Sequence, residues 1–203
     1  MISCIVLAGG KSERMGRDKR LIKVKGKYLL ERVLEAAGQF SDDVILSLCS
    51  KEQLPADITI TAPKIALDEL PLKSPLVGIL SGLRLCSNEY AAVVPCDSPF
   101  LKPGVFQLMA EEARGHDAVV PKRGDLLEPL HAVYNVQAMI AACEAGVKAD
   151  SLGVSAAIAR LEKVKYIPIE AFKGIDEKLL TFYNVNYPED LNALEDGLID
   201  DDS

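Results

Sequence analysis

The opening of the chain places the strongest constraint on its fold. Ile2–Leu7 is a mostly apolar run, typical of a strand that is buried on both faces of a parallel sheet. The run breaks at a pair of glycines, and Ala8–Lys19 follows as a loop with three glycines and four basic residues. Glycines let a backbone approach an anion closely, while Arg and Lys supply positive charge. The opening therefore predicts a phosphate-binding loop at the end of a central strand.

The spacing of these glycines argues against two common nucleotide-binding motifs. Glycines at positions 9, 10 and 16 do not fit the dinucleotide-binding pattern G-x-G-x-x-G. They do not fit the P-loop pattern either, because Arg17 follows Gly16 where that motif requires Lys. A nicotinamide-dependent oxidoreductase is also disfavoured because no clear ribose-binding acid ends the second expected strand.

Hydrophobic patterning predicts alternating strands and helices along the chain. The expected strands are Ile2–Leu7, Asp43–Leu48, Ile58–Ile60, Tyr90–Pro95, Ala118–Pro121, Pro129–Tyr134, Val164–Ile169 and Thr181–Val185. The expected helices are Lys27–Ala37, Ser74–Leu85, Pro103–Arg114, Val136–Ala145 (closed by Gly146), Ser151–Leu161 and Pro188–Leu194. This order predicts a three-layer α/β fold of Rossmann-like type, with a mainly parallel sheet, helices on both faces and a mixed late edge. We expect one domain over residues 1–203, with an acidic tail from about residue 196.

Composition narrows the class of protein. The net charge of −7 argues against a general nucleic-acid binder. Five cysteines without a C-x-x-C pair are expected to be buried free thiols in a reducing compartment. Because the chain shows neither an apolar run long enough to span a bilayer nor a signal peptide, we expect a cytoplasmic protein without a membrane partner.

The opening resembles the signature of the molybdenum cofactor guanylyltransferase family. In that family a strand ends in Leu-Ala-Gly-Gly and continues with Ser, Arg-Met-Gly and Asp-Lys. The matching residues are Leu7, Ala8, Gly9, Gly10, Ser12, Arg14, Met15, Gly16, Asp18 and Lys19. The resemblance implies that Leu7, Ala8, Gly9, Gly10, Ser12, Arg14 and Lys19 bind the nucleotide. Arg14 and Lys19 would act in catalysis by neutralising the departing pyrophosphate.

A second resemblance lies at Val93–Pro99, where an apolar strand runs into Asp97. Mg²⁺ prefers oxygen ligands and often takes one or two carboxylates plus substrate phosphates. In the family, an Asp in a Pro-Cys-Asp-x-Pro setting holds the catalytic Mg²⁺, which implies that Asp97 is a catalytic, metal-binding and nucleotide-contacting residue. The alternative is an Asp that only caps a helix or turn before Pro99.

The close of the chain, Thr181–Leu191, resembles the family's Asn-Val-Asn-x-Pro-Glu-Asp ending. Residues two apart share one face of a strand, so Asn184 and Asn186 are expected to point the same way. Asn186 is a candidate second metal ligand, and both asparagines are candidate contacts to the second substrate. The alternative is that Asn186 caps a helix that begins near Pro188.

Three further positions have weaker signals. The resemblance places Asp68 and Gly78 around the guanine base and ribose, and an acid suits the donor edge of guanine. His131 is a candidate contact to a pterin phosphate, although a lone His is more often structural. The second strand departs from the family, since Ser47 or Cys49 stands where an Asn usually touches the nucleotide.

The resemblance implies transfer of GMP from GTP to molybdopterin or its Mo-bound form, with Mg²⁺ as cofactor and pyrophosphate as product. Transient contacts with other proteins of cofactor biosynthesis would accompany it. The alternatives are a related nucleotidyltransferase acting on another acceptor, which includes molybdopterin cytidylyltransferases, guanylyltransferases of cobinamide phosphate or phospholactate, and sugar-phosphate nucleotidylyltransferases. A non-catalytic nucleotide-binding protein is a further alternative, disfavoured because Arg14, Lys19 and Asp97 are all present.

Overall fold

The computed structural model describes residues 1–9, 22–24, 26–50, 64–68, 70, 72, 74–187 and 189–190. Its strands are β1 (Ser3–Leu7), β2 (Lys23–Val24), β3 (Lys27–Tyr28), β4 (Asp43–Leu48), β5 (Lys64–Leu67), β6 (Tyr90–Pro95), β7 (Ala118–Arg123), β8 (Leu126–Leu127), β9 (Ala132–Asn135) and β10 (Val164–Pro168). Its α-helices are α1 (Leu29–Ala37), α2 (Pro75–Leu83), α3 (Pro103–Glu112), α4 (Val136–Lys148) and α5 (Val154–Ile158). Short 3₁₀ turns cover Ile169–Phe172 and Leu180–Phe182.

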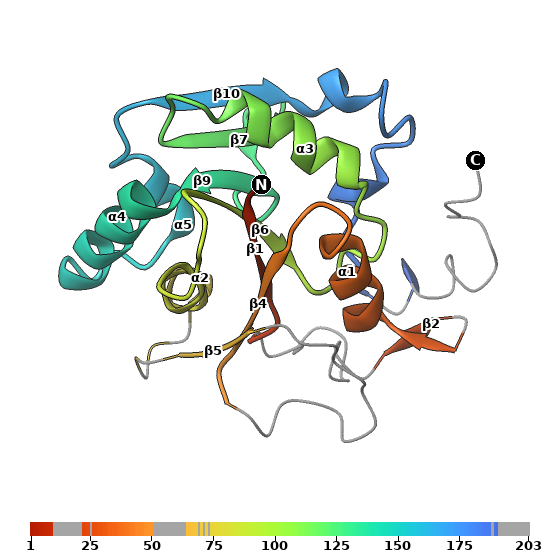
Figure 1. Cartoon of the computed structure of the whole chain (residues 1–203), viewed down its shortest axis with the longest axis horizontal. Coiled ribbons are helices and arrows are strands. Elements are labelled where there is room, and N and C mark those ends of the chain that lie inside the picture. The colour runs from red at the N-terminus through yellow and green to blue at the C-terminus, as the bar shows by residue number, and fades with distance from the viewer. Residues whose placement is uncertain are drawn as a thin grey trace.

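Within the described residues, one sheet of eight strands organises the fold (Figure 1). The strand order is β10-β7-β9-β6-β1-β4-β5, with β8 paired to β7. Strands β6, β1, β4 and β5 are parallel neighbours, and β10 is parallel to β7. The predicted mixed character is confirmed, but β9, antiparallel to both β6 and β7, lies inside the sheet and not at its edge.

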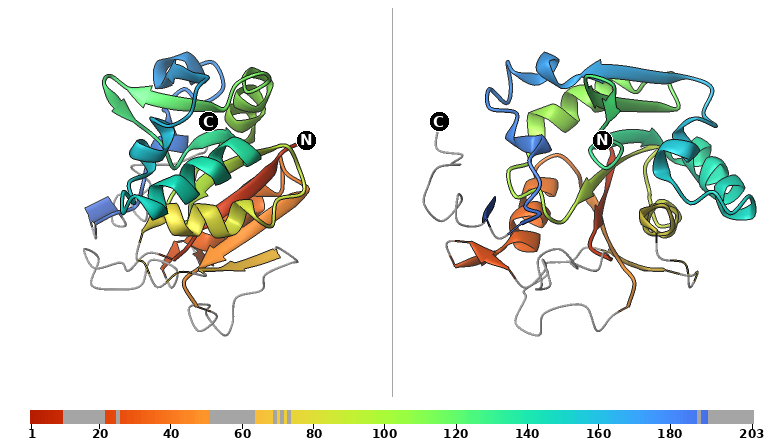
Figure 2. Two further views of the ribbon diagram at one scale, coloured as in Figure 1. Left: turned by 90° about the vertical axis from the view of Figure 1, so that its left-hand side faces the viewer. Right: turned by 180° about the vertical axis from the view of Figure 1, so that it is seen from behind.

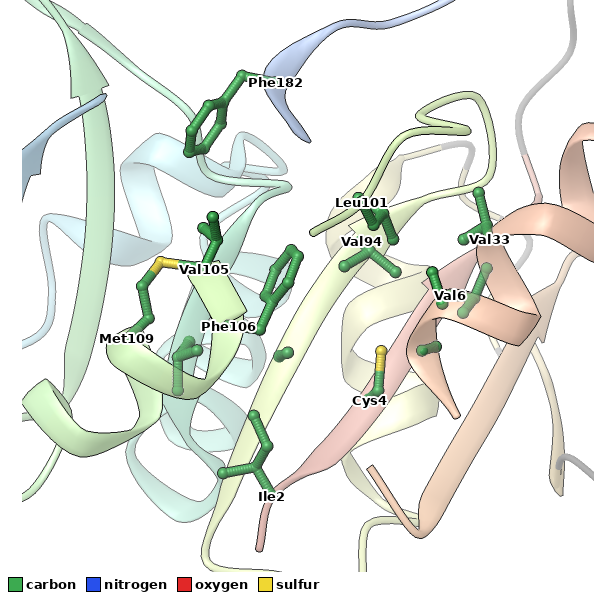
Figure 3. Close-up of a cluster of buried hydrophobic side chains, with 14 of the residues drawn as sticks. Ile2, Cys4, Val6, Val33, Val94, Leu101, Val105, Phe106, Met109 and Phe182 are labelled. Atoms are coloured by element: carbon green, nitrogen blue, oxygen red, sulfur yellow. The ribbon is translucent and has the colours of Figure 1, made fainter. Parts of the chain in front are cut away.

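Side chains of β1 alternate between the two covered faces of the sheet, as a strand requires. Cys4 and Val6 belong to the cluster under α1 and α3, whereas Ile5 belongs to the cluster under α2, α4 and α5. Figure 3 shows residues of the first cluster, with Phe106 and Met109 on α3, Val6 on β1 and Val94 on β6. On the other face α2 and α4 lie side by side (Figure 2). The predicted three-layer arrangement is therefore confirmed.

Local sequence signals explain the two helices of the second face. Ser74 caps α2 by accepting a hydrogen bond from the Leu76 N–H, and Pro75 occupies the first turn, as predicted. Asn135 caps α4 in the same way. The prediction that Gly146 ends α4 was wrong. A Cβ there would lie 2.9 Å from the Ser151 carbonyl oxygen, so this glycine serves close packing inside the helix.

The predicted strand Thr181–Val185 was also wrong. The buried carboxylate of Asp176 accepts hydrogen bonds from the N–H groups of Leu180 and Thr181, at 3.0 and 2.7 Å. These bonds wind the chain into the 3₁₀ turn at Leu180–Phe182, after Leu179 with φ of 55°. Phe182 reaches from this turn into the first core cluster (Figure 3).

The remaining predicted elements differ mainly at their ends. The helix expected over Ser151–Leu161 forms only at Val154–Ile158. The strand expected at Ile58–Ile60 and the acidic tail lie outside the described residues, as does most of the helix expected at Pro188–Leu194. None of the helices in the described part of the chain is both long and apolar enough to cross a membrane.

Candidate functional site

Four parallel strands end at one edge of the sheet, and most of the predicted site residues that the structure describes lie there. Backbone hydrogen bonds join the strand ends: Ala8 N–H donates to the Ser47 carbonyl at 2.9 Å, and Cys96 N–H donates to the Leu7 carbonyl at 3.0 Å. Asp68 N–H donates to the Leu48 carbonyl at 3.0 Å. In parallel α/β sheets ligands bind beyond this carboxyl edge. The edge is therefore the candidate active site.

Gly9 and Cys49 are in close contact just beyond the ends of β1 and β4. A Cβ on Gly9 would lie 2.8 Å from the Cys49 sulfur, so only glycine fits here without a shift. The Cys49 thiol donates to the Gly9 carbonyl oxygen, also at 2.8 Å. Cys49 is exposed, which corrects the expectation that all five thiols are buried. Ser47 is buried, so of the two residues considered for the missing Asn only Cys49 is exposed at the edge.

Asp68 and Gly78 lie close together, as the resemblance implied. A Cβ on Gly78 would lie 2.9 Å from Ser47 Oγ, 3.3 Å from Leu7 Cδ2 and 3.8 Å from Asp68 Oδ1. Ser47 Oγ donates to the Gly78 carbonyl at 3.0 Å and thereby ties β4 to the first turn of α2. Leu7, Ser47, Asp68 and Gly78 thus form one compact corner of the edge.

The carboxylate of Asp68 is an unusual group at this corner. Its Oδ1 is buried and has no hydrogen-bond partner within the described residues. Burial raises the pKa of Asp68, and the neighbouring Cys49 side chain partly counteracts the rise. Buried polar atoms are almost always satisfied in folded proteins, so this carboxylate oxygen is an acceptor for which the described residues supply no donor.

Asp97 follows β6 directly and is half-buried in a turn. Its carbonyl oxygen accepts a hydrogen bond of 2.8 Å from the Val185 N–H. Further along the same turn, the Lys102 N–H donates to Thr181 Oγ1 at 3.1 Å. The segment at residues 181–185 therefore runs antiparallel beside the turn that presents Asp97, although it forms no regular strand.

Ser98, which the sequence analysis did not single out, lies at the centre of this junction. It is wholly buried, and its Oγ is 2.5 Å from Asn184 Oδ1 and 2.9 Å from His131 Nε2. Its position directly after Asp97 is the signal that could have revealed it. The Ser98 hydroxyl thus connects three segments: the turn that carries Asp97, the segment before β9 that carries His131, and the C-terminal segment that carries Asn184.

The expectation that His131 meets a substrate phosphate directly is corrected by its burial. Only 1% of its surface is exposed, and burial, together with the charge of Arg123, lowers the pKa of His131 to about 3. Its ring lies edge-on to Phe182. His131 is therefore a neutral side chain beneath the site.

Asn184 and Asn186 do not share a strand face as predicted, because the strand does not form. Asn184 points its amide oxygen at Ser98, whereas Asn186 donates its N–H to Asp190 Oδ2 at 2.7 Å and its side-chain amide to the Asn184 carbonyl at 3.3 Å. Asp190 Oδ1 also accepts a hydrogen bond from the Tyr183 hydroxyl. The loop that carries both asparagines is thus held by Ser98 and Asp190.

The remaining predicted nucleotide contacts lie partly outside the described residues. Leu7 ends β1 at the site edge, and Ala8 and Gly9 follow it directly. The structure does not describe the range that contains Gly10, Ser12, Arg14 and Lys19. Their assignment stays a prediction.

Comparison with known proteins agrees with this architecture. The model of the MobA-like NTP transferase domain matches residues 4–164. A protein of Natronomonas pharaonis named probable molybdenum cofactor guanylyltransferase is 35% identical over 96% of each chain. A protein of Methanosarcina acetivorans with the same name is 35% identical over 95% of this chain and 89% of its own.

A solved structure supports the same assignment. The crystal structure of molybdopterin-guanine dinucleotide biosynthesis protein A from Archaeoglobus fulgidus superposes with a TM-score of 0.83. It is 29% identical and covers 97% of this chain and 98% of its own. The sheet order, the site at its carboxyl edge and these matches together establish that the chain belongs to the MobA-like NTP transferase family.

Proposed function

We propose that this nucleotidyltransferase moves GMP from GTP to molybdopterin or its Mo-bound form and releases pyrophosphate. The names of its relatives point to this reaction, and one observation in the structure supports the choice of base. Guanine presents two donors, a ring N–H and an exocyclic amine, on the edge that an acid can reach. Asp68 offers a buried carboxylate oxygen without a partner in the described residues. Adenine would present a ring acceptor to that oxygen and leave it unsatisfied.

The proposed chemistry needs no general base. The acceptor phosphate is already anionic near neutral pH, and its oxygen attacks the α-phosphorus in line. A bond forms between that oxygen and the α-phosphorus, while the bond to the bridging oxygen of pyrophosphate breaks. Catalysis then consists of positioning and charge neutralisation. Gly9 allows the backbone to approach the triphosphate, and we assign Arg14 and Lys19 to the neutralisation of the departing pyrophosphate.

The residues at the Asp97 turn fit a magnesium ion. Mg²⁺ in nucleotide sites usually takes one or two carboxylates plus substrate phosphates and water. The turn carries the half-buried carboxylate of Asp97. We assign the amide oxygen of Asn186, in the adjoining loop, as the second candidate ligand. When bound, Mg²⁺ would supply charge stabilisation at the α-phosphate. The chain itself sets where Asp97 lies, through the hydrogen bond from Val185 to the Asp97 carbonyl.

The direct experiment is pyrophosphate release with GTP, CTP, ATP or UTP and Mg²⁺, with and without molybdopterin. Release only with GTP plus molybdopterin supports the proposal. Release with CTP plus molybdopterin would instead indicate a cytidylyltransferase, and GTP binding without turnover on molybdopterin would direct the search to other acceptors.

Asp68→Asn tests the base assignment within the same assay. The amide replaces an acceptor by a donor, so the preference for GTP over ATP should fall by roughly 10²–10⁴-fold, as in sites that lose a buried partner for a substrate donor. Asp125→Asn, at an exposed position in the β7–β8 hairpin, is the matched control. An unchanged preference in Asp68→Asn would contradict the assignment.

A further inference from the structure

The three side chains at Ser98 form a hydrogen-bonded relay whose direction the structure defines. The Ser98 hydroxyl carries one proton, and it donates that proton to Asn184 Oδ1 at 2.5 Å. Ser98 Oγ must then accept from His131 Nε2 at 2.9 Å. The relay runs from His131 through Ser98 to Asn184 and requires the neutral His131 tautomer with its proton on Nε2.

The opposite direction is disfavoured by the other ring nitrogen of His131. That nitrogen, Nδ1, is buried and has no hydrogen-bond partner in the described part of the chain. If the Asn184 amide were turned to donate to Ser98, Ser98 would donate to Nε2 and the ring proton would sit on Nδ1. A buried N–H donor without an acceptor is costly, whereas a bare ring nitrogen is tolerated more easily. The environment of His131 therefore fixes the orientation of the Asn184 amide.

This orientation leaves Asn184 with a donor to offer. Its Oδ1 is used by Ser98, and its backbone carbonyl accepts from Asn186. Its Nδ2 has no partner among the described residues, and Asn184 itself is only half-buried. The adjacent Val185 N–H is bonded to the Asp97 carbonyl, so this amide lies beside the turn proposed to hold the metal. An N–H donor in that place suits an anionic oxygen.

We propose that His131 and Ser98 are positioning residues that orient the Asn184 amide so that its Nδ2 donates to a phosphate oxygen of the second substrate. The proposal rests on the nucleotidyltransferase function inferred above. A purely structural role for His131 and Ser98 would affect both substrates alike. The proposed role affects only the second substrate, through the single donor atom Asn184 Nδ2. The proposal also gives a role to His131, which is buried beneath the site with no partner for Nδ1 among the described residues.

Kinetics of matched variants test the relay. Ser98→Ala removes both hydrogen bonds of the relay, whereas His131→Leu removes only the one to Ser98. Each variant should raise the KM for molybdopterin about tenfold, the equivalent of one net hydrogen bond to the substrate. GTP affinity should not change. His131→Gln retains an N–H donor and should recover most of the loss. Asn184→Asp keeps an acceptor for Ser98 but replaces the donor, so it should raise the same KM at least as much. His116→Gln, at the other histidine of the chain, serves as the control.

Two kinetic results would overturn the relay. One is a parallel loss of GTP affinity and acceptor affinity in Ser98→Ala, which would indicate general damage. The other is a His131→Gln variant as impaired as His131→Leu while its thermal unfolding remains that of the wild type.

Nitrogen NMR of the wild-type protein tests the same proposal without turnover. The chain has two histidines, so the spectrum of His116→Gln assigns both. We expect His131 with a protonated Nε2 and a bare Nδ1, and a shift of the Asn184 side-chain amide on titration with inorganic phosphate. A protonated Nδ1, or an Asn184 amide that phosphate does not move, would overturn the relay. A wild type that shows the expected NMR behaviour but no turnover would instead count against the proposed function alone.

Discussion

The backbone N–H of Val185 donates a 2.8 Å hydrogen bond to the carbonyl oxygen of Asp97. Bonds from Lys102 to Thr181 and from Ser98 to Asn184 continue the same antiparallel contact. The turn after β6 is therefore shaped by a segment from the far end of the chain. Asp97 depends for its position on residues that are distant in sequence, which links the stability of the C-terminal segment to the metal-binding role proposed for Asp97.

Asp97→Asn should remove turnover without unfolding the protein. The amide cannot supply the negative charge that a divalent cation requires, so the rate should fall by roughly 10²–10³-fold or more, as when a principal electrostatic contact is lost. The backbone carbonyl that Val185 contacts is retained, so thermal unfolding should not change. Pyrophosphate release measures the rate, with Asp125→Asn as control. Near wild-type turnover in Asp97→Asn would refute its assignment to the metal.

Substitution of two glycines of α2, Gly78 and Gly82, can distinguish an effect on the nucleotide site from an effect on the core. A Cβ on Gly82 would lie 2.6 Å from Ile5 Cγ2, and one on Gly78 would lie 2.9 Å from Ser47 Oγ. Both Gly→Ala changes should cost about 1–3 kcal/mol of unfolding free energy, the usual cost of overpacking. Only Gly78→Ala should also weaken GTP binding, because it displaces the corner that holds Asp68. Calorimetric titration of both variants with GTP decides this. Equal GTP affinities would remove Gly78 from the nucleotide site.

The parallel core could be predicted from sequence because its signals are local. The runs Asp43–Leu48 and Tyr90–Pro95 are mostly apolar, and the structure places β4 and β6 with these same bounds. The cap at Ser74 was predictable for the same reason, since the hydroxyl and the following proline act within one turn. The placement of Asp68 beside Gly78 needed the family resemblance, because the two residues come from different elements.

The C-terminal segment could not be predicted in this way. Thr181–Val185 alternates like a strand, but the carboxylate of Asp176 captures two of its N–H groups and the backbone turns. Ser98 escaped attention because a serine before a proline is an ordinary turn residue. Its role depends on Asn184 and His131, which only the fold brings to it.

The ionised carboxylate of Asp43 should make the free energy of unfolding fall as the pH is lowered into the acidic range. Burial opposes ionisation of this carboxylate, but hydrogen bonds from Lys64, Ser3 and the Ser87 N–H outweigh burial and lower the pKa of Asp43. A lowered folded pKa contributes stability above the unfolded value of about 3.9 and loses it as the pH falls through the folded value.

Asp43→Asn should therefore destabilise the protein at neutral pH by roughly 1–3 kcal/mol, the range for hydrogen bonds to a charged group. The difference from wild type should shrink as the pH falls below about 3.9. Urea unfolding of both proteins across this range measures the difference. A gap that stays constant with pH would show that the ionised carboxylate does not stabilise this network.

Asp176 should couple the fold of the C-terminal segment to the second substrate. Its wholly internal carboxylate bonds the N–H groups of Leu180 and Thr181, and the same turn leads directly to Asn184. Asp176→Ala leaves both N–H groups without this acceptor, which should cost about 1–2 kcal/mol or more of unfolding free energy. It should also raise the KM for molybdopterin while GTP affinity is preserved, because Asp68 and Gly9 belong to other elements. Asp176→Asn retains one acceptor oxygen, so its stability and its KM for molybdopterin should lie between those of the wild type and Asp176→Ala. If Asp176→Ala lost stability but kept the wild-type KM for the acceptor, the segment at residues 180–186 would not contact that substrate.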